Sequence, residues 1–256
     1  MDLGLKNKKA LVTGASSGLG FAAASVLAKE GAELSIVSRS KERIQKAARS
    51  IEADSGAKVA ALTADLRNAG DIEKLKETVG ETDILVVSTG GPPGGSLDSF
   101  GPGEWKKQYE GLFESVLRLS SAFAPGMRRR GWGRIVYITS VNILNPQLNM
   151  AFSNAIRAGI AGLAKSQALE WGKDGITINC AAPGLFATDR LRELFEPMAR
   201  EAGMELEEYL RKKGEALPVR RIGRPEEMGS LIAYLASELS GYMNGLVLPI
   251  DGGQHI

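Results

Sequence analysis

The segment Thr13-Gly14-Ala15-Ser16-Ser17-Gly18-Leu19-Gly20 is the most informative stretch of this chain of 256 residues. It follows the apolar run 10–13, which predicts a buried strand, and it opens a helical pattern over 18–30. Glycine permits a tight turn there and lets the main chain approach a pyrophosphate group, which then lies at the helix N-terminus. Three glycines could serve only a tight turn, but their place directly after the first predicted strand favours a dinucleotide site.

Short apolar runs and helical patterns alternate along the remaining chain. The predicted strands cover 10–13, 33–38, 58–64, 83–88, 134–140, 176–181 and 246–250. The predicted helices cover 18–30, 41–54, 71–79, 104–130, 151–172 and 225–236, with Asp71 as the cap of the third. The strands are continuous apolar runs, which is typical of parallel sheets covered on both faces. Residues 1–256 therefore predict an α/β fold, a single-domain Rossmann-type doubly wound parallel sheet with helices on both faces.

Composition and charge narrow the function classes. Lys plus Arg number 32 and Asp plus Glu number 30, so the net charge of +2 gives no reason to expect nucleic acid or an anionic membrane as a partner. With one cysteine and one histidine, the chain offers neither an internal disulfide nor a metal-ligand cluster, and Cys180 is expected in the core. There is no apolar run near the ~18–20 residues of a membrane span and no apolar leader, so we expect a soluble, cytoplasmic protein.

Further motifs, spread over nearly the full length, resemble those of the short-chain dehydrogenase/reductase family. T-G-x-x-x-G-x-G is the cofactor signature of that family, Asp65-Leu66 resembles its adenine-contacting pair, and Pro183-Gly184 with Thr188 resembles its nicotinamide-side loop. The segment 221–227 and Asp251-Gly252-Gly253 are similar to its 3-oxoacyl-carrier-protein reductase branch. The resemblance implies a nicotinamide dinucleotide bound by Gly14, Ser16, Ser17, Gly18, Leu19, Gly20, Asp65, Leu66, Gly90, Pro183, Gly184 and Thr188.

The end of the second predicted strand bears on the choice of cofactor. It reads Val37-Ser38-Arg39-Ser40, without the carboxylate that would accept hydrogen bonds from the ribose 2′-hydroxyl of NAD. The guanidinium of Arg39, with the neighbouring hydroxyl of Ser38, suits a 2′-phosphate instead. An arginine at a strand end is also common as a plain surface residue, but together with the glycine segment it favours NADP(H) over NAD(H).

The catalytic positions depart from the family pattern of Asn, Ser, Tyr and Lys. Ser140, at the end of the fifth predicted strand, matches the Ser. Ser153 and Arg157 stand at the Tyr and Lys positions, and Leu112 stands at the Asn position. The four-residue spacing puts Ser153 and Arg157 on one helix face. The candidate catalytic residues are therefore Ser140, Ser153 and Arg157, and Arg157 is also a candidate cofactor ligand as a fixed cation.

The proton donor for a reduced carbonyl stays open at this point. A serine hydroxyl is a far weaker acid than a tyrosine beside a lysine, and arginine is neither acid nor base near neutral pH. Tyr137 precedes Ser140 by three residues on one strand, so the two side chains should point to opposite faces. A water held by Ser140, Ser153 and Asn154 is one alternative, and a Ser153 without any chemical role is another.

Three functions fit these residues. The first is an NADP(H)-dependent oxidoreductase that interconverts a small carbonyl and an alcohol, with 3-oxoacyl compounds as one substrate class, through an altered proton relay. The second is an NADP(H)-binding protein of the same fold that has lost redox catalysis. A dehalogenase-like enzyme fits less well, because the lineage it resembles uses Ser, Tyr and Arg, and this chain lacks the Tyr and keeps the glycine segment.

Three further features bear on the substrate and on assembly. The charged helical insertion at 189–213 predicts an apolar lid over the substrate or, alternatively, a packing face of its own. The Gly- and Pro-rich loop 90–95 predicts a rigid floor that faces the cofactor. The helices predicted at 104–130 and 151–172 carry more apolar surface than one sheet can cover. We therefore expect a homo-oligomer, and the family resemblance implies a homotetramer.

Overall fold

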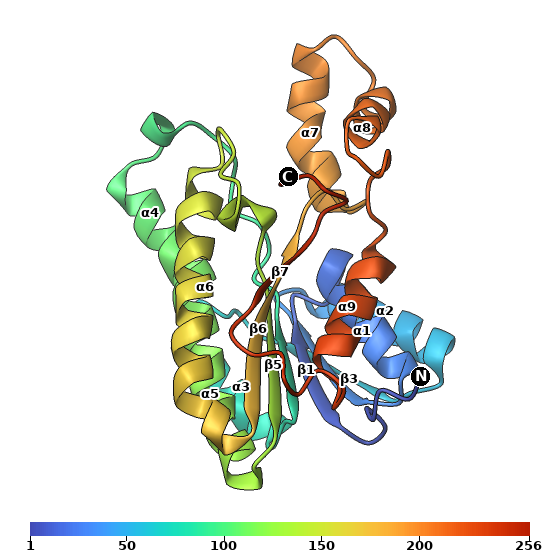
Figure 1. Ribbon diagram of the computed structural model, residues 1–256, viewed down its shortest axis with the longest axis vertical. Helices are drawn as coiled ribbons and strands as arrows, with labels where there is room; N and C mark the ends of the chain where they lie inside the picture. The colour runs from blue at the N-terminus through green and yellow to red at the C-terminus, as the bar shows by residue number, and fades with distance from the viewer.

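The computed structural model describes residues 1–256 and contains one seven-stranded parallel sheet in the order β3-β2-β1-β4-β5-β6-β7 (Figure 1). The predicted Rossmann-type fold is thereby confirmed. The strands are β1 (Lys9–Thr13), β2 (Glu33–Ser38), β3 (Val59–Thr63), β4 (Ile84–Val87), β5 (Gly133–Ile138), β6 (Ile176–Pro183) and β7 (Val247–Ile250). The helices are α1 (Gly18–Lys29), α2 (Lys41–Ser55), α3 (Ala69–Val79), α4 (Pro102–Tyr109), α5 (Ser115–Arg130), α6 (Ala151–Trp171), α7 (Asp189–Glu201), α8 (Leu206–Glu215) and α9 (Pro225–Leu235).

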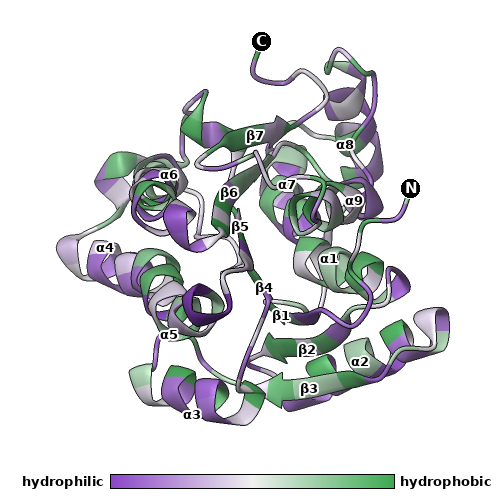
Figure 2. Cartoon of the chain, turned by 60° about the horizontal axis from the view of Figure 1, so that its bottom comes forward, coloured by the Kyte–Doolittle hydropathy of each residue, from purple (hydrophilic) through white to green (hydrophobic).

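Each face of the sheet buries a hydrophobic core of its own, and helices cover both faces (Figure 2). Along β1, Val12 belongs to the core beneath α1, α2 and α9, whereas Leu11 belongs to the core beneath α3, α5 and α6. Successive strand residues point to opposite faces, so a strand covered on both sides must be apolar throughout. Cys180 is fully buried in the second core, as its apolar neighbours predicted.

The sheet is built outward in both directions from β1. This strand pairs with β2 on one side and with β4 on the other, and the later strands extend beyond β4. In open α/β sheets, ligands bind outside the carboxyl ends of the strands at such a switch point. The carboxyl ends of β1 and β4 therefore mark the place to look for a site.

Two predicted helices differ from the structure for local reasons. The helix predicted at 104–130 is interrupted by a π-helical segment, Glu110–Glu114, which separates α4 from α5. The third helix begins earlier than predicted because the side chain of Asn68 accepts a hydrogen bond from the Gly70 N–H. Asp71 is thus not the cap, and it accepts a hydrogen bond from the main-chain N–H of Asp65 (2.9 Å).

The structure contains neither a candidate membrane-spanning helix nor a candidate metal cluster. No helix combines the length and the apolar character needed to cross a membrane. No three His, Cys, Asp or Glu side chains are grouped so that they could hold a metal ion.

Candidate functional site

A cleft of about 1020 Å³ lies at the carboxyl ends of the central strands. Its walls come from the β1–α1 loop, the ends of β2, β4, β5 and β6, and helices α6 and α7. The predicted cofactor-binding and catalytic residues all line it. These residues are Gly14, Ser16, Ser17, Gly18, Leu19, Gly20, Ser38, Arg39, Asp65, Leu66, Gly90, Ser140, Ser153, Arg157, Pro183, Gly184 and Thr188.

The glycine segment is packed too closely for side chains at two positions. Gly14 has φ +60°, and a Cβ there would lie 2.5 Å from the carbonyl oxygen of Ser88. A Cβ on Gly20 would lie 2.4 Å from the carbonyl oxygen of Gly14. Ser17, the N-cap of α1, makes no side-chain capping bond, so the first N–H groups of that helix remain available at the cleft. This geometry fits a pyrophosphate.

A hydroxyl clip fixes the glycine segment against β4. The Thr13 Oγ1 donates to the Ser88 carbonyl (3.1 Å) and accepts from the Ser88 N–H (3.0 Å). Both bonds lie at the switch point, where β1 and β4 end side by side. The clip therefore holds the two strand ends that form the floor of the cleft.

Two arginines lie near the end of β2. Arg39 is exposed at the cleft and has no salt-bridge partner. Arg43, on the first turn of α2, donates from Nη2 to the Ser17 hydroxyl (3.2 Å) and also lines the cleft. Sequence reasoning missed Arg43, although its place three residues after the cap Ser40 puts it on the first turn of the helix that starts beside Arg39. The pair offers a cationic surface that suits a 2′-phosphate.

Asp65 is held by a neighbour on the same loop. Arg67 donates to both carboxylate oxygens of Asp65, with Nε–Oδ1 at 3.0 Å and Nη2–Oδ2 at 2.5 Å. These bonds keep the pKa of the Asp65 carboxyl below its usual range, although partial burial opposes the shift. Asp65 therefore stays ionised and fixed beside Leu66 at the cleft wall.

Ser140 and Ser153 place two hydroxyls at the opposite end of the cleft. The Ser140 Oγ accepts from the Asn142 N–H (3.2 Å) and donates to no protein group, so its proton is free for a ligand. Ser153, on the first turn of α6, is buried and lines the cleft, and its hydroxyl makes no hydrogen bond within the protein. Neither serine has a basic or acidic side chain to activate it.

Arg157 lies one turn further along α6 and is buried. Its Nη1 donates to the carbonyl of Ile138 (2.9 Å) and its Nη2 to the carbonyl of Gly90 (2.6 Å). Burial lowers the pKa of Arg157 to about 10, and the positive charge of Arg190 adds to the shift. Arg157 still carries its charge at neutral pH, and its partners are carbonyl dipoles instead of an anion.

The other suggested proton donors lie elsewhere. Tyr137 is buried on the α5–α6 side of the sheet, where its hydroxyl donates to the Gln167 Oε1 (2.5 Å). Burial raises the pKa of this hydroxyl above its usual range. The side chain of Asn154 donates to the Gln147 carbonyl (2.8 Å) and does not line the cleft, so the relay through Asn154 is wrong. Leu112 lies in the π-helical segment and belongs to the same small core as Phe152. Its side chain makes this part of the cleft wall apolar.

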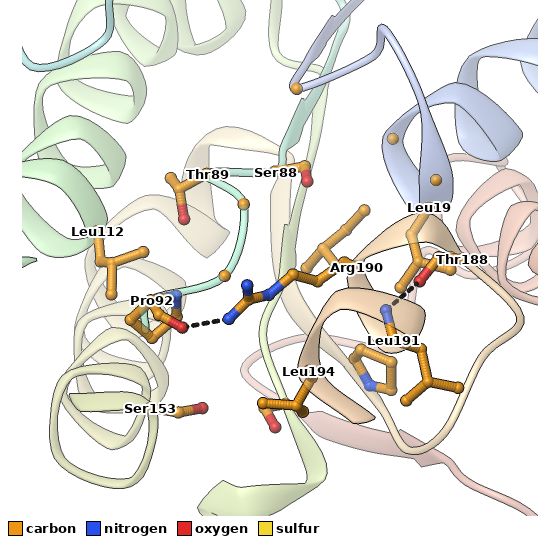
Figure 3. A pocket seen from close by; sticks show the side chains of 18 of the residues that line it. Leu19, Ser88, Thr89, Pro92, Leu112, Ser153, Thr188, Arg190, Leu191 and Leu194 are labelled. Atoms are coloured by element: carbon orange, nitrogen blue, oxygen red, sulfur yellow. Dashed lines mark hydrogen bonds between the residues drawn. The ribbon is translucent and has the colours of Figure 1, made fainter. Parts of the chain in front are cut away.

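Helix α7 contributes a residue that sequence reasoning missed. Arg190 extends across the cleft, and its Nη2 donates to the Pro92 carbonyl (2.5 Å), as Figure 3 shows. The loop 90–95 lines the cleft through Gly90, Gly91, Pro92 and Pro93. The Arg190–Pro92 bond therefore joins the helical insertion to the loop that follows β4.

The insertion stands above the sheet as the pair α7 and α8 (Figure 1). The apolar residues of its two helices lie in different environments. Leu191, Leu194, Phe195 and Met198 on α7 line the cleft. Leu206, Tyr209 and Leu210 on α8 do not line it and pack against α7 as a small separate core.

The fold and the glycine segment define an α/β protein of the Rossmann type. A family model described as enoyl-(acyl carrier protein) reductase matches residues 14–255. A dehydrogenase/reductase SDR family member 4 from Bos taurus is 31% identical over 254 residues, 97% of this chain and 88% of the relative. A 3-oxoacyl-(acyl-carrier-protein) reductase from Pseudomonas aeruginosa is 32% identical over 258 residues, 99% of this chain and 100% of the relative. The chain belongs to the short-chain dehydrogenase/reductase family of oxidoreductases.

Solved structures of other proteins are similar to this one over nearly the full chain. An L-sorbose reductase from Gluconobacter frateurii, in complex with NADPH and L-sorbose, has a TM-score of 0.93 and 31% identity, and the match covers 100% of this chain and 99% of that one. YwfH, an NADPH-dependent reductase involved in bacilysin biosynthesis, has a TM-score of 0.90 and 26% identity over 98% of this chain and 99% of that one. These similar proteins act with NADPH.

Proposed function

We propose that this protein is an NADP(H)-dependent oxidoreductase that transfers a hydride between the nicotinamide and a carbonyl/alcohol substrate, with an altered proton relay. The observation that carries the proposal is the unpaired Arg39 at the end of β2, in the cleft that begins at the glycine segment. The NADPH-dependent reductases of similar structure support it. The 3-oxoacyl compounds of the related bacterial reductase are one substrate class to test.

Different residues of the cleft wall would contact different parts of the dinucleotide. The N-terminus of α1 and Gly14 would hold the pyrophosphate, and Arg39 with Ser38 would hold the 2′-phosphate. Asp65 and Leu66 would border the adenine. Gly90, Arg157, Pro183, Gly184 and Thr188 would surround the nicotinamide end.

When bound there, NADPH supplies the hydride for carbonyl reduction. The two free hydroxyls of Ser140 and Ser153 can donate hydrogen bonds to the substrate oxygen as negative charge develops on it. Arg157 adds a fixed positive charge on the same wall of the cleft. Neither serine has a base to replace its proton, so the proton that completes the alcohol comes from solvent in this scheme.

A second candidate function is dinucleotide binding without redox turnover. The observation that favours it is the lack of an acidic or basic side chain at Ser140 and Ser153. General acid catalysis contributes about 10²–10⁴-fold to rates of proton transfer, so its loss at this position would leave a slow reductase or none.

Two measurements made on the same sample separate the candidates. Fluorescence titration measures the affinity for NADPH and NADH, and absorbance at the reduced nicotinamide band follows NADPH oxidation with a panel of ketones, aldehydes and 3-oxoacyl thioesters. NADPH binding with turnover of any panel member supports the oxidoreductase. NADPH binding without turnover supports the second candidate, and no binding of either dinucleotide contradicts both.

A further inference from the structure

Two arginines from different helices bond to the same short loop. Arg157 of α6 donates to the Gly90 carbonyl, and Arg190 of α7 donates to the Pro92 carbonyl, two residues further along. The loop follows the carboxyl end of β4 and lines the same cleft as Ser153, and Figure 3 shows Pro92 and Ser153 on the side of the cleft that Arg190 reaches. The two guanidiniums are close enough that the charge of Arg190 affects Arg157.

This end of the cleft has more positive than negative charge. Arg157 has no carboxylate partner, and Arg190 has only Glu193, at 3.6 Å and on a side chain that is 68% exposed. Exposed ion pairs of this kind are weak, at about 0–1 kcal/mol. Asp189 is the other carboxylate on this wall and is exposed, whereas the exposed Lys107 and Lys213 add positive charge at the rim.

Arg190 is also available to a ligand. Its side chain is 43% exposed, and its bond to Pro92 is to a neutral carbonyl. A carboxylate accepts from a guanidinium about twice as strongly as a neutral oxygen and can take two parallel bonds. Gly91 leaves the room that this side chain occupies, because a Cβ there would lie 2.7 Å from the Arg190 Nε.

The surroundings describe the rest of the ligand. Leu112 from the π-helical segment and Leu194 from α7 line the cleft with Arg190 and Ser153. A molecule that fits has an anionic group, a short apolar body and an oxygen for the serines. A large neutral sugar would offer no anionic group to the Arg190 guanidinium.

We propose that Arg190 binds a carboxylate of the substrate, so that the protein acts on oxo acids and not on neutral ketones. The inference rests on the proposed oxidoreductase function and names its substrate class. On binding, the carboxylate replaces the Pro92 carbonyl as the acceptor of the Arg190 hydrogen bond.

The test measures both binding and turnover in the full-length protein with NADPH. Thermal unfolding is recorded with pentanoate and with pentanamide, two probes that contain no reducible carbonyl. NADPH oxidation is recorded with 2-oxopentanoate and 4-oxopentanoate and with their methyl esters. We expect pentanoate to stabilise the protein and pentanamide not to, and we expect kcat/KM for the acids to exceed that for the esters by about 10- to 150-fold.

Two variants localise the effect. Arg190→Gln should abolish the pentanoate shift and the preference for acids, while fluorescence titration still shows NADPH binding. Arg192→Gln is the matched control, because Arg192 lies on the same helix, pairs with Glu207 and does not line the cleft. Equal shifts with pentanoate and pentanamide, or a pentanoate shift that persists in Arg190→Gln, would overturn the inference. An Arg190-dependent pentanoate shift without any NADPH oxidation would instead contradict the oxidoreductase function alone.

Discussion

Arg157 donates a hydrogen bond from Nη1 to the main-chain carbonyl of Ile138 at 2.9 Å, and so joins α6 to the end of β5. The second guanidinium bond, to the Gly90 carbonyl, joins the same helix to the loop after β4. One buried side chain thus fixes Ser153, which precedes it by one helical turn, relative to the two central strands. Arginine suits this task because its planar fork reaches two acceptors at once.

The first prediction follows from that fork. Arg157→Lys should lower the free energy of unfolding by about 1–3 kcal/mol, because the single nitrogen of lysine does not span the two carbonyls that the guanidinium reaches with separate Nη atoms, so one carbonyl loses its donor. Urea unfolding at neutral pH measures the change. Ser153→Ala is the matched control on the same helix face and should change stability little, because the Ser153 hydroxyl bonds to nothing in the protein. Equal stability of Arg157→Lys and wild type would show that the carbonyl bonds are not important for the fold.

Arg39 carries the second prediction. Arg39→Asp should weaken NADPH binding by about 1.5–3 kcal/mol, because a charge-assisted bond to the 2′-phosphate is lost and a repulsive charge is introduced. NADH binding should be unchanged or tighter. Fluorescence titration with both dinucleotides measures the two affinities. Arg49→Asp is the matched control, because it makes the same change at an exposed residue of α2, and it should leave both affinities unaltered. A wild type that prefers NADH would refute the role given to Arg39.

The sequence predicted which residues line the cleft beside β1 and β2, because the determinants there are local. The glycines of 14–20 and the strand that precedes them form one turn, and Arg39 directly follows the next strand. Each of these positions is defined by residues within a few places along the chain. The resemblance to the family supplied Asp65, Pro183 and Thr188 in the same way, motif by motif.

The part of the cleft beside α6 and α7 could not be predicted to the same degree. Arg190 and Pro92 are 98 residues apart, and their contact depends on how the α7–α8 insertion sits over the sheet. The spacing of residues along the chain does not predict where this insertion lies. A π-helical segment such as the one that presents Leu112 has no sequence pattern of its own, so the sequence indicated one continuous helix over 104–130. At the start of α3 the sequence predicted Asp71 as the cap, but the structure gives that role to Asn68, and the Asp71 carboxylate bonds to the Asp65 N–H instead.

The third prediction concerns pH and the start of α9. Hydrogen bonds from the Arg221 side chain and then from the Arg224 main-chain N–H lower the pKa of Glu227 to about 2. Because the folded-state pKa is lowered, this stabilisation is complete above the unfolded-state value of about 4.3 and is lost as the pH falls towards 2. Glu227→Gln should therefore cost about 0.5–1.5 kcal/mol at pH 7, since the pair is partly solvated, and much less at pH 3.

Urea unfolding of wild type and Glu227→Gln at pH 7, 5 and 3 tests this directly. The neighbouring Glu226→Gln serves as the control, because Glu226 is exposed and its side chain has no partner. A difference between wild type and Glu227→Gln that stays constant from pH 7 to pH 3 would contradict the assignment.

The fourth prediction concerns assembly. Leu169 is 85% exposed near the end of α6, and Tyr242 is fully exposed on the segment that Asn244 ties to the Ala168 carbonyl. We expect these apolar groups to lie at a contact between copies of the chain, within a homotetramer. Light scattering at micromolar concentration should give a tetramer for wild type and smaller species for Leu169→Asp with Tyr242→Asp. Leu97→Asp, at an exposed residue of the β4–α4 connection, should leave the mass unchanged. A monomeric wild type would contradict the prediction.

The last prediction concerns the proton relay. If Ser153 replaces an acid in an otherwise working site, Ser153→Tyr together with Arg157→Lys should raise NADPH oxidation by about 10²–10⁴-fold with whichever substrate shows the highest basal rate. A tyrosine beside an ammonium has a lowered pKa and can protonate the new alkoxide. Both changes are needed, because tyrosine alone lacks the compact cation and lysine alone has nothing to activate. The lysine also gives up a carbonyl bond, so the double variant should be less stable while it is more active.

Two residues of the cleft, Leu112 and Ser140, determine how large this gain in NADPH oxidation can be. Leu112 offers no amide to extend a proton path, so the increase should fall towards the lower end of the range, and Leu112→Asn in the double variant should raise it further. Ser140→Ala in the double variant should remove most of the gain, because its hydroxyl is the remaining donor to the substrate oxygen. A double variant that binds NADPH as wild type does, yet oxidises it no faster, would mean that this cleft has been rebuilt for another chemistry or for binding alone.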